Sequence, residues 1–420
     1  MPVYFRNRGS DITYGIIPIE KMGGNKLTYS MYGDNIPVVL ENDESISKVK
    51  VNSHVTWYLT DKGNLYGCGI NDYGQQGSGD TKDVLTFTKR ASNVKDFVCS
   101  NFTTWYVDNN NDLYGCGYNY YEQQANGNSN NVKLFEKRAS GIKAFDCSIN
   151  NTWYLDFNGD LWGCGDYSQG QLGSGMIVVG SFNKRASNVR EFTLGGNATW
   201  YITNDGDLYG TGDDYHGQQG TGKGYSEDVK AFAKRASNVK KVMSTEQTTL
   251  YLDNNGDLYA AGYDNITIDT SFGKRAENVK DFSCSKQTIF YIDNNNDLYG
   301  YGKGNYGQQG SGTSDVKTFT KRAENVKEVF CSSDTTWYID YNNDLYGCGA
   351  NFFGQQGTGD TKHVTKFTKR ASNVKDFACS SATTWYVTDG LYGCGYNTDG
   401  QQGDGTKTNV LTFTKIELPK

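Results

Sequence analysis

Several features that would point to chemistry are scarce in this chain. Its three histidines, His54, His216 and His363, stand in unrelated contexts, and none has the spacing of a zinc site. No stretch reaches the roughly 18 apolar residues of a membrane span, and the N-terminus lacks the apolar centre of a signal peptide. No nucleophile elbow, phosphate loop or pair of catalytic carboxylates stands out. We therefore expect a non-enzymatic protein without cofactor, metal or membrane span, made in the cytosol.

Clusters of Lys and Arg are also missing. The formal net charge is −6 and no basic tail or basic helix face is present, whereas duplex binding needs clustered cations. Nucleic acid is therefore not an expected partner. What the chain has instead is 31 Tyr, 20 Phe and 51 Gly, a composition that suits short strands joined by tight turns in an all-β fold.

One short string recurs eight times along the sequence. Leu-Tyr-Gly-Cys-Gly, or a close variant, begins at Leu65, Leu113, Leu161, Leu208, Leu258, Leu298, Leu345 and Leu391, with spacings of 40 to 50 residues. A unit of this length cannot bury a hydrophobic face alone and must stack on its neighbours. We expect one repeat domain over residues 36–420, preceded by a separate segment over residues 1–35.

Each unit carries four strand signals. In the unit around Lys89 to Gly117, these signals are Phe-Thr-Lys-Arg (residues 87–90), Val-Lys-Asp-Phe-Val-Cys, Thr-Trp-Tyr-Val and Asp-Leu-Tyr-Gly-Cys. Asn and Gly turns separate them. Four antiparallel strands per unit, with aromatic and Gly residues at fixed offsets, predict an all-β β-propeller. A solenoid is the alternative, although its repeats are usually shorter or helical.

The loop after this string resembles a known repeat. Gly170-Gln171-Leu172-Gly173 and the related Gly-Gln-Gln-Gly segments, with the cysteine strand and the Leu-Tyr-Gly strand, resemble the regulator-of-chromosome-condensation repeat family. The resemblance spans about residues 36–416 and implies a propeller, usually with seven blades. Eight copies of the Thr-Trp-Tyr strand predict eight blades instead; their marker residues are Trp57, Trp105, Trp153, Trp200, Leu250, Phe290, Trp337 and Trp385.

Two irregularities are expected in the ring. The unit after Leu258 has lost its Gly-Gln-Gln-Gly loop, which predicts one irregular interface between blades. Strands near Ile36 to Leu40 and near Phe413 to Glu417 compete for one outer position, which suggests a ring closed by both termini. Residues 1–35 carry no repeat marks but are apolar, so we expect them to anchor the chain either to the ring or to another protein.

Three recurring features have both a structural and a functional interpretation. Cysteines occupy two positions of the repeat where Val, Leu, Thr, Ser, Ala or Tyr stands in other copies, which favours buried free thiols; disulfides are the alternative for an exported protein. Lys-Arg-Ala recurs seven times, either to guard strand edges or to form a basic ring. Asp- and Asn-rich turns, at 108–112, 253–257 and 293–297, favour tight turns over calcium loops.

The connection after each Leu-Tyr-Gly-Cys-Gly string is where the copies diverge most. Clustered Tyr beside Asn and Asp is typical of a recognition surface, and the alternative is that the same rings pack between blades. The candidate partner-binding residues are Tyr73, Tyr120, Tyr121, Tyr167, Tyr215, Tyr306, Phe352 and Phe353.

These observations favour a non-enzymatic binding or structural propeller. Its composition resembles that of bacteriophage virion or tail proteins and bacterial surface proteins, so we expect the aromatic loops to recognise a protein or a glycan and residues 1–35 to join a larger assembly. The family resemblance implies two alternatives, a guanine-nucleotide exchange factor for a small GTPase and a proteinaceous enzyme inhibitor.

Overall fold

The computed structural model describes residues 26–31, 34–39, 44–173, 180–223, 227–264 and 266–417, and all regular secondary structure in them is β-strand. The chain divides into one unit from Met1 to Ser45 and a second from Ile46 to Lys420. In the first unit, β1 (Lys26–Met31) pairs antiparallel with β2 (Asp34–Val39). Residues 1–25, most of the expected anchor, lie outside the described residues.

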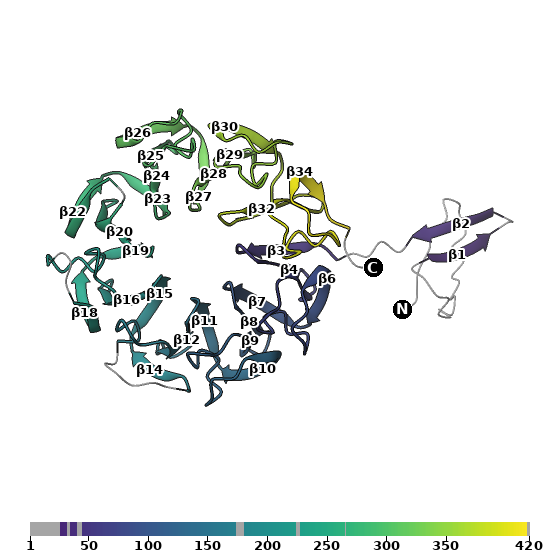
Figure 1. Cartoon of the computed structure of the whole chain (residues 1–420), viewed down its shortest axis with the longest axis horizontal. Coiled ribbons are helices and arrows are strands. Elements are labelled where there is room, and N and C mark those ends of the chain that lie inside the picture. Colours follow the sequence, from purple (N-terminus) through teal and green to yellow (C-terminus); the bar gives the residue numbers. More distant parts are fainter. Residues whose placement is uncertain are drawn as a thin grey trace, which may run out of the picture. The chain divides into compact units, whose positions relative to one another are not determined.

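The second unit is a ring of eight four-stranded antiparallel sheets. This confirms the predicted propeller and its eight blades. The first strand of each blade lies at the centre of the ring and the fourth at its rim (Figure 1). Each blade is contiguous in the sequence, because its four strands follow one another along the chain.

The strands of the first four blades are, in order, β3 (Ile46–Val51), β4 (Val55–Thr60), β5 (Leu65–Gly69), β6 (Val84–Ala91); β7 (Val94–Cys99), β8 (Thr103–Asp108), β9 (Asp112–Gly117), β10 (Val132–Ser140); β11 (Ile142–Cys147), β12 (Asn151–Asp156), β13 (Leu161–Gly165), β14 (Asn183–Ala186); β15 (Val189–Gly195), β16 (Ala198–Thr203), β17 (Leu208–Gly212), β18 (Val229–Ala236). Those of the last four are β19 (Val239–Ser244), β20 (Thr248–Asp253), β21 (Leu258–Tyr263), β22 (Ile268–Ala276); β23 (Val279–Cys284), β24 (Thr288–Asp293), β25 (Leu298–Gly302), β26 (Val316–Ala323); β27 (Val326–Cys331), β28 (Thr335–Asp340), β29 (Leu345–Gly349), β30 (Val364–Ala371); β31 (Asp376–Cys379), β32 (Thr383–Val387), β33 (Leu391–Gly395), β34 (Val410–Lys415).

The predicted closure of the ring by both termini is wrong. The last blade takes its outer strand, β34, from its own sequence, and Ile36 to Val39 lie in β2, which pairs with β1. The first and last blades instead meet face to face, as the other blades do. Trp385 packs edge-on against Phe87 at 5.8 Å, and Val49 N donates a 2.6 Å hydrogen bond to Asp376 Oδ2. The grouping of strands also differs from the expected unit, because the Lys-Arg-Ala strand ends a blade and does not begin one.

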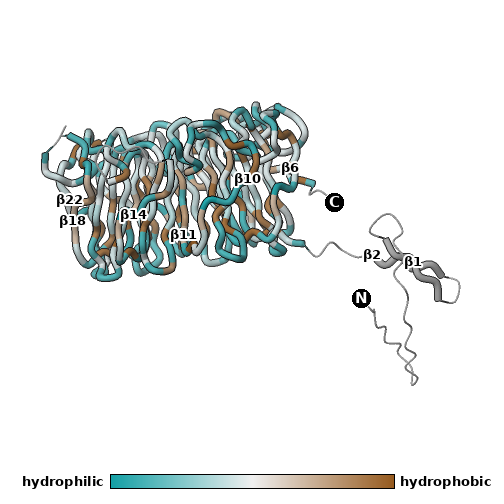
Figure 2. The backbone as a smooth tube through the Cα atoms, turned by 90° about the horizontal axis from the view of Figure 1, so that it is seen from below, coloured by the Kyte–Doolittle hydropathy of each residue, from teal (hydrophilic) through white to brown (hydrophobic). Residues whose placement is uncertain are grey.

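The repeated aromatic and Gly residues form the interfaces between blades. Trp105 on β8 pairs with Gly115 on β9, where an added Cβ would lie 2.4 Å from the indole ring. On the other side of the same blade, Tyr106 stacks on Tyr114 at 4.8 Å and meets Phe135 of the outer strand. Apolar residues accordingly lie along the strands, between the two faces of the ring (Figure 2). Glycine at the position of Gly115 leaves room for the large ring beside it, and in the fifth blade, where Leu250 replaces that ring, the paired residue is Ala260.

The interface after the shortened fifth blade is irregular, as predicted. Only four residues join β21 to β22, and no Gly-Gln-Gln loop covers the sixth blade. Tyr301 replaces the usual cysteine there and its ring approaches Phe319 at 5.4 Å. A cavity of about 310 Å³ remains beside these two rings. The larger side chain thus fills part of the space that the lost loop leaves.

The outer lysines and the Asp-rich turns neutralise each other. Lys137 Nζ lies 2.6 Å from Asp112 Oδ2, and equivalent Lys and Asp pairs recur in the later blades. In the same turn, Asp108 Oδ1 accepts hydrogen bonds from the backbone N–H groups of Asn110 and Asp112. These lysines therefore do not present a free basic ring, and the Asp108 carboxylate is engaged in holding its own turn.

The ten cysteines are free thiols, and those of the Leu-Tyr-Gly-Cys-Gly strands are buried. Each of these thiols donates to a backbone carbonyl of the preceding blade; Cys116 Sγ, for example, lies 3.4 Å from Gln75 O. Thr211 Oγ1 likewise donates to a carbonyl of the preceding blade, that of Gly170, at 2.9 Å. Six blades therefore have a small hydrogen-bond donor at this position, whereas the fifth and sixth have Ala261 and Tyr301. Burial raises the pKa of the Cys116 thiol far above its usual value, which disfavours the thiolate.

Candidate functional site

One face of the ring carries two sets of connections: the turns between first and second strands and the long loops between third and fourth strands. We call it the loop face. The opposite face, which we call the hairpin face, carries the short turns between second and third strands. Of the ten large hydrophobic side chains exposed among the described residues, six belong to loop-face connections: Tyr120, Tyr121, Ile149, Tyr215, Phe352 and Phe353. Apolar surface is thus concentrated on the loop face.

A buried Asn or Asp side chain holds the long loop in the first, second, fourth, seventh and eighth blades. In the second blade, Asn119 Nδ2 donates to Asn126 Oδ1 and to the carbonyls of Asn128 and Asn130, at 2.6 to 2.9 Å. Asn119 Oδ1 accepts from the backbone N–H of Gln124 at 2.8 Å. These four bonds fix the course of the loop within its own blade.

The paired glutamines of the loop have different partners. Gln124 Nε2 donates to Cys116 O of its own blade at 2.9 Å. Gln123 Nε2 donates across the interface to Ile149 O of the next blade at 3.1 Å, and Gln123 Oε1 accepts from Tyr121 N at 3.0 Å. The tip of the loop is thereby tied both to its own blade and to its neighbour, which presents Tyr121 on a rigid support.

The second blade departs from the glycines of the repeat. Its loop reads Glu-Gln-Gln-Ala where the first blade has Gly-Gln-Gln-Gly, yet Glu122 and Ala125 keep the left-handed backbone, with φ of 61° and 52°. A residue with a Cβ in this conformation costs roughly 1 to 2 kcal/mol. The first blade places Gly74 and Gly77 at these positions, with φ of 82° and 62°. The second blade therefore carries backbone strain next to its exposed tyrosines.

The eight candidate aromatic residues do not form one continuous patch. Tyr120 is 66% exposed and Tyr121 37%, and their rings meet edge-on at 5.1 Å. Both lie 6.4 Å from Tyr118, which joins them to Tyr73 at 4.9 Å. Tyr73 is half-buried between the first two blades and also contacts Phe102. We call Tyr73, Phe102, Tyr118, Tyr120 and Tyr121 the tyrosine cluster.

The remaining candidates lie in other loops. Tyr306 and Phe352 meet at 5.2 Å and both contact His363, while Phe353 packs edge-on against Tyr396. Tyr215 contacts His216, and Tyr167 packs against the buried core between the third and fourth blades. Packing between blades therefore accounts for Tyr73 and Tyr167. Exposed aromatic surface comes from Tyr120 and Tyr121 of the tyrosine cluster, and from Phe352 and Phe353.

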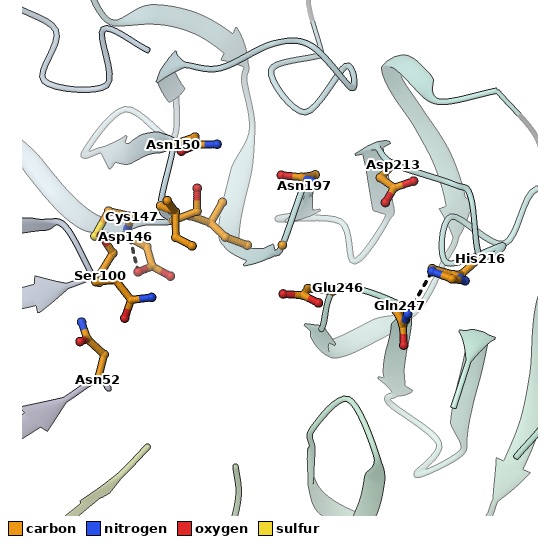
Figure 3. Close-up of a pocket in the computed structure, with 15 residues that line it drawn as sticks. Asn52, Ser100, Asp146, Cys147, Asn150, Asn197, Asp213, His216, Glu246 and Gln247 are labelled. Carbon is orange, nitrogen blue, oxygen red and sulfur yellow. Dashed lines mark hydrogen bonds between the residues drawn. The ribbon is translucent and has the colours of Figure 1, made fainter. Parts of the chain in front are cut away.

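A polar pocket of about 610 Å³ opens on the loop face, lined by turns of five successive blades, the first to the fifth. Figure 3 shows the carboxylates of Asp146 and Glu246 on either side of its open centre. The side-chain amides of Asn150 and Asn197 come from equivalent turns of neighbouring blades. His216 contributes a ring whose Nε2 lies 3.0 Å from Gln247 Nε2. The lining is thus composed mainly of amides and carboxylates.

The charge in the pocket is negative and partly offset. Burial raises the pKa of the Asp146 carboxyl above its usual range, while a hydrogen bond from Cys147 N and the charge of Lys50 oppose that shift. Lys286 Nζ lies 3.3 Å from Glu246 Oε2. The site therefore repels anions without presenting a fully uncompensated negative charge.

Sequence reasoning missed this pocket because it followed the most variable loops and passed over the short turns. The sequence did contain a signal. The residue before the second strand is Asn or Gln in four blades, at Asn150, Asn197, Gln247 and Gln287, and is another residue type in the other four. In the described part of the chain, no group of three or more His, Cys, Asp and Glu side chains has a metal-binding arrangement, and no helix is long and apolar enough to cross a membrane.

Fold and site together define an eight-bladed β-propeller with its variable connections on one face. No protein-family model and no curated protein matches the sequence. Among solved structures, human WBSCR16 is similar over 76% of this chain and 96% of its own, with a TM-score of 0.59 and 14% identity. Prp20p from Saccharomyces cerevisiae is similar over 85% of this chain and 84% of its own, with a TM-score of 0.55 and 16% identity. Yeast RCC1 (Prp20), in its structure with Kap60, is similar over 97% of this chain and 91% of its own, with a TM-score of 0.57 and 14% identity. The resemblance to the chromosome-condensation regulators is thereby confirmed at the level of the fold.

Proposed function

We propose that this protein is a non-enzymatic binding propeller that recognises a macromolecular partner through its loop face, with the tyrosine cluster as the anchor. The observation that carries the proposal is the loop of the second blade. There, exposed Tyr120 and Tyr121 stand beside Glu122 and Ala125, which hold a strained left-handed backbone. Rigid Tyr side chains supply large contact area at low entropic cost, and strain of this kind gathers at functional sites.

The solved relatives of this fold give the proposal its partner class. Prp20p has binding properties towards Gsp1p and histones, and yeast RCC1 (Prp20) is bound by Kap60, so these similar propellers bind proteins. A protein is accordingly the first partner to seek for the tyrosine cluster. Membership of a virion or a bacterial surface, and a role for residues 1–35 in assembly, stay predictions from composition; mass spectrometry of purified particles and envelopes tests both.

The test compares the two faces of the ring. In the Tyr120→Ser/Tyr121→Ser variant, capture of partner from the native source is expected to fall at least tenfold. The matched control is Phe157→Ser/Tyr341→Ser on the hairpin face, where the side chains are 61% and 47% exposed, and it is expected to retain capture. Because all four side chains are partly exposed, each substitution is expected to cost about 1 kcal/mol or less. Loss of capture with both variants, or with the control alone, contradicts the proposal.

The likeness to Prp20 favours one second candidate, an exchange factor for a small GTPase. An exchange factor accelerates release of bound nucleotide at substoichiometric concentration, whereas a binding propeller does not. Release of a fluorescent GDP analogue from GTPases of the native source separates the two. Acceleration that disappears in Tyr120→Ser/Tyr121→Ser would place exchange at the tyrosine cluster.

A further inference from the structure

We infer that the polar pocket on the loop face is a second recognition site, and that it binds a neutral oligosaccharide. The inference rests on the proposed recognition function of this face and names the ligand class of a site that the tyrosine cluster does not include. Three properties of the pocket carry it: its size, its hydrogen-bonding capacity and its charge.

The size and position suit a small ligand. A volume of about 610 Å³ lies within the range of roughly 300 to 1,000 Å³ typical of ligand pockets. Most of the walls come from the turns of successive blades, whose positions are fixed by the strands behind them, and Asp213 and His216 come from the long loop of the fourth blade. The fold itself therefore forms the pocket.

The pocket offers hydrogen-bonding groups that the protein does not use. Among the described residues, no hydrogen bond engages the side-chain amides of Asn101, Asn150 and Asn197. Each amide provides two donors and one acceptor, and each carboxylate provides further acceptors. A ligand rich in hydroxyl groups, which both donate and accept, matches this mixed set. Ile149, 45% exposed, and Leu194 add apolar surface for the carbon face of a sugar ring.

The charge of the pocket selects among ligands. Asp146, Asp213 and Glu246 disfavour phosphates and acidic sugars through like-charge repulsion. A protein hot spot is also disfavoured, because the centres of protein interfaces are depleted of charged residues and enriched in aromatic ones. A cationic ligand is less well matched than a neutral one, since Lys286 already lies beside Glu246 and Asp213 Oδ1 already accepts from Tyr215 N at 2.8 Å.

The test uses a glycan array of neutral and acidic oligosaccharides with the full-length protein, followed by calorimetry with the best neutral glycan and with trilysine. Neutral glycans are expected to bind. Asn150→Ala and Asn197→Ala are each expected to weaken binding about tenfold, because each removes one amide that hydrogen-bonds the ligand. Gln287→Ala is the matched control: it occupies the equivalent turn of the sixth blade, does not line this pocket, and is expected to leave affinity unchanged.

Charge neutralisation supplies a second readout that does not depend on loss of binding. The Asp213→Asn/Glu246→Gln variant is expected to gain binding of acidic glycans that the wild type rejects. No glycan binding, equal binding of acidic glycans by the wild type, tighter binding of trilysine, or unchanged affinity in Asn150→Ala and Asn197→Ala would each overturn the inference. If these assays fail while Tyr120→Ser/Tyr121→Ser still abolishes macromolecular capture, only the oligosaccharide site is refuted and the proposed function stands.

Discussion

Removing the buried asparagine of one long loop should destabilise the ring measurably. In the seventh blade, the fully buried Asn351 donates through Nδ2 to Thr358 Oγ1, Asp360 O and Lys362 O at 2.9, 2.9 and 3.1 Å. Asn351 Oδ1 also accepts from Gln356 N at 2.8 Å. At a net value of about 0.5 to 1.5 kcal/mol for each bond, Asn351→Ala is expected to lower the free energy of unfolding by about 2 to 6 kcal/mol.

A second substitution separates the donors from the acceptor. Asn351→Asp keeps an oxygen for Gln356 N but loses the three donated bonds and places a carboxylate against two carbonyl oxygens. It should therefore destabilise the ring as well. The fourth blade has Asp214 at the equivalent position, and there Thr221 Oγ1 donates to Asp214 Oδ2 at 2.6 Å. In the seventh blade, Thr358 Oγ1 already donates to Asp360 Oδ1 at 2.8 Å, so the same contact in Asn351→Asp would cost that hydrogen bond.

Equilibrium unfolding in urea measures both effects. The control is Asn305→Ala, an exposed residue of the sixth-blade loop whose Oδ1 accepts one bond, from Gln308 Nε2 at 3.2 Å. The control should change stability by about 1 kcal/mol or less. If Asn351→Ala and Asn351→Asp both change the free energy of unfolding by less than about 0.5 kcal/mol, the loops are not held by this side chain and the scaffold argument fails.

Three further predictions concern strain, packing and acid. Ala125→Gly should raise the free energy of unfolding by roughly 1 kcal/mol in urea titrations, because glycine adopts the left-handed φ of 52° without penalty; a loss of stability would show that the Ala125 methyl is needed. Gly115→Ala should lower the melting temperature, because the new Cβ would lie 2.4 Å from Trp105. The expected loss in the free energy of unfolding is about 1 to 3 kcal/mol or more. An unchanged melting temperature would contradict the packing described. The hydrogen bond from Lys369 lowers the pKa of the Asp344 carboxyl. The ion pair of these two residues therefore stabilises the folded state above about pH 4, and this stabilisation is lost as the pH falls through the lowered pKa. Melting temperatures of wild type and Lys369→Met should therefore differ at neutral pH and converge in acid, and a constant difference would refute this.

The repeat made the fold predictable, and its irregularities were predictable where they changed the length of a unit. Eight copies of one string gave eight blades, and the shortened unit after Leu258 gave the irregular interface. The closure could not be predicted in the same way. Ile36 to Val39 read as a strand and do form one, but their partner is β1, and pairing between distant strands is set by tertiary contacts that a strand pattern does not encode.

The candidate site was predictable only in part. The aromatic loops were found because they vary while the strands repeat, yet whether a ring is exposed depends on its neighbours: Tyr120 has space around it, whereas Tyr73 has Phe102 and Tyr118. The pocket was missed because its residues come from five blades that follow one another about one repeat apart, and only the curvature of the ring brings Asn150 and Asn197 to one opening.

Photo-crosslinking from matched positions tests the central claim, recognition through the loop face, most directly. p-Benzoylphenylalanine replaces Tyr120 on the loop face in one protein and Phe157 on the hairpin face in another, at side chains that are 66% and 61% exposed. Each protein is irradiated in extract of the native source. The account predicts a defined adduct from position 120, competed by excess wild type but not by Tyr120→Ser/Tyr121→Ser, and none from position 157. Adducts that form equally from both positions, or only from position 157, would contradict it.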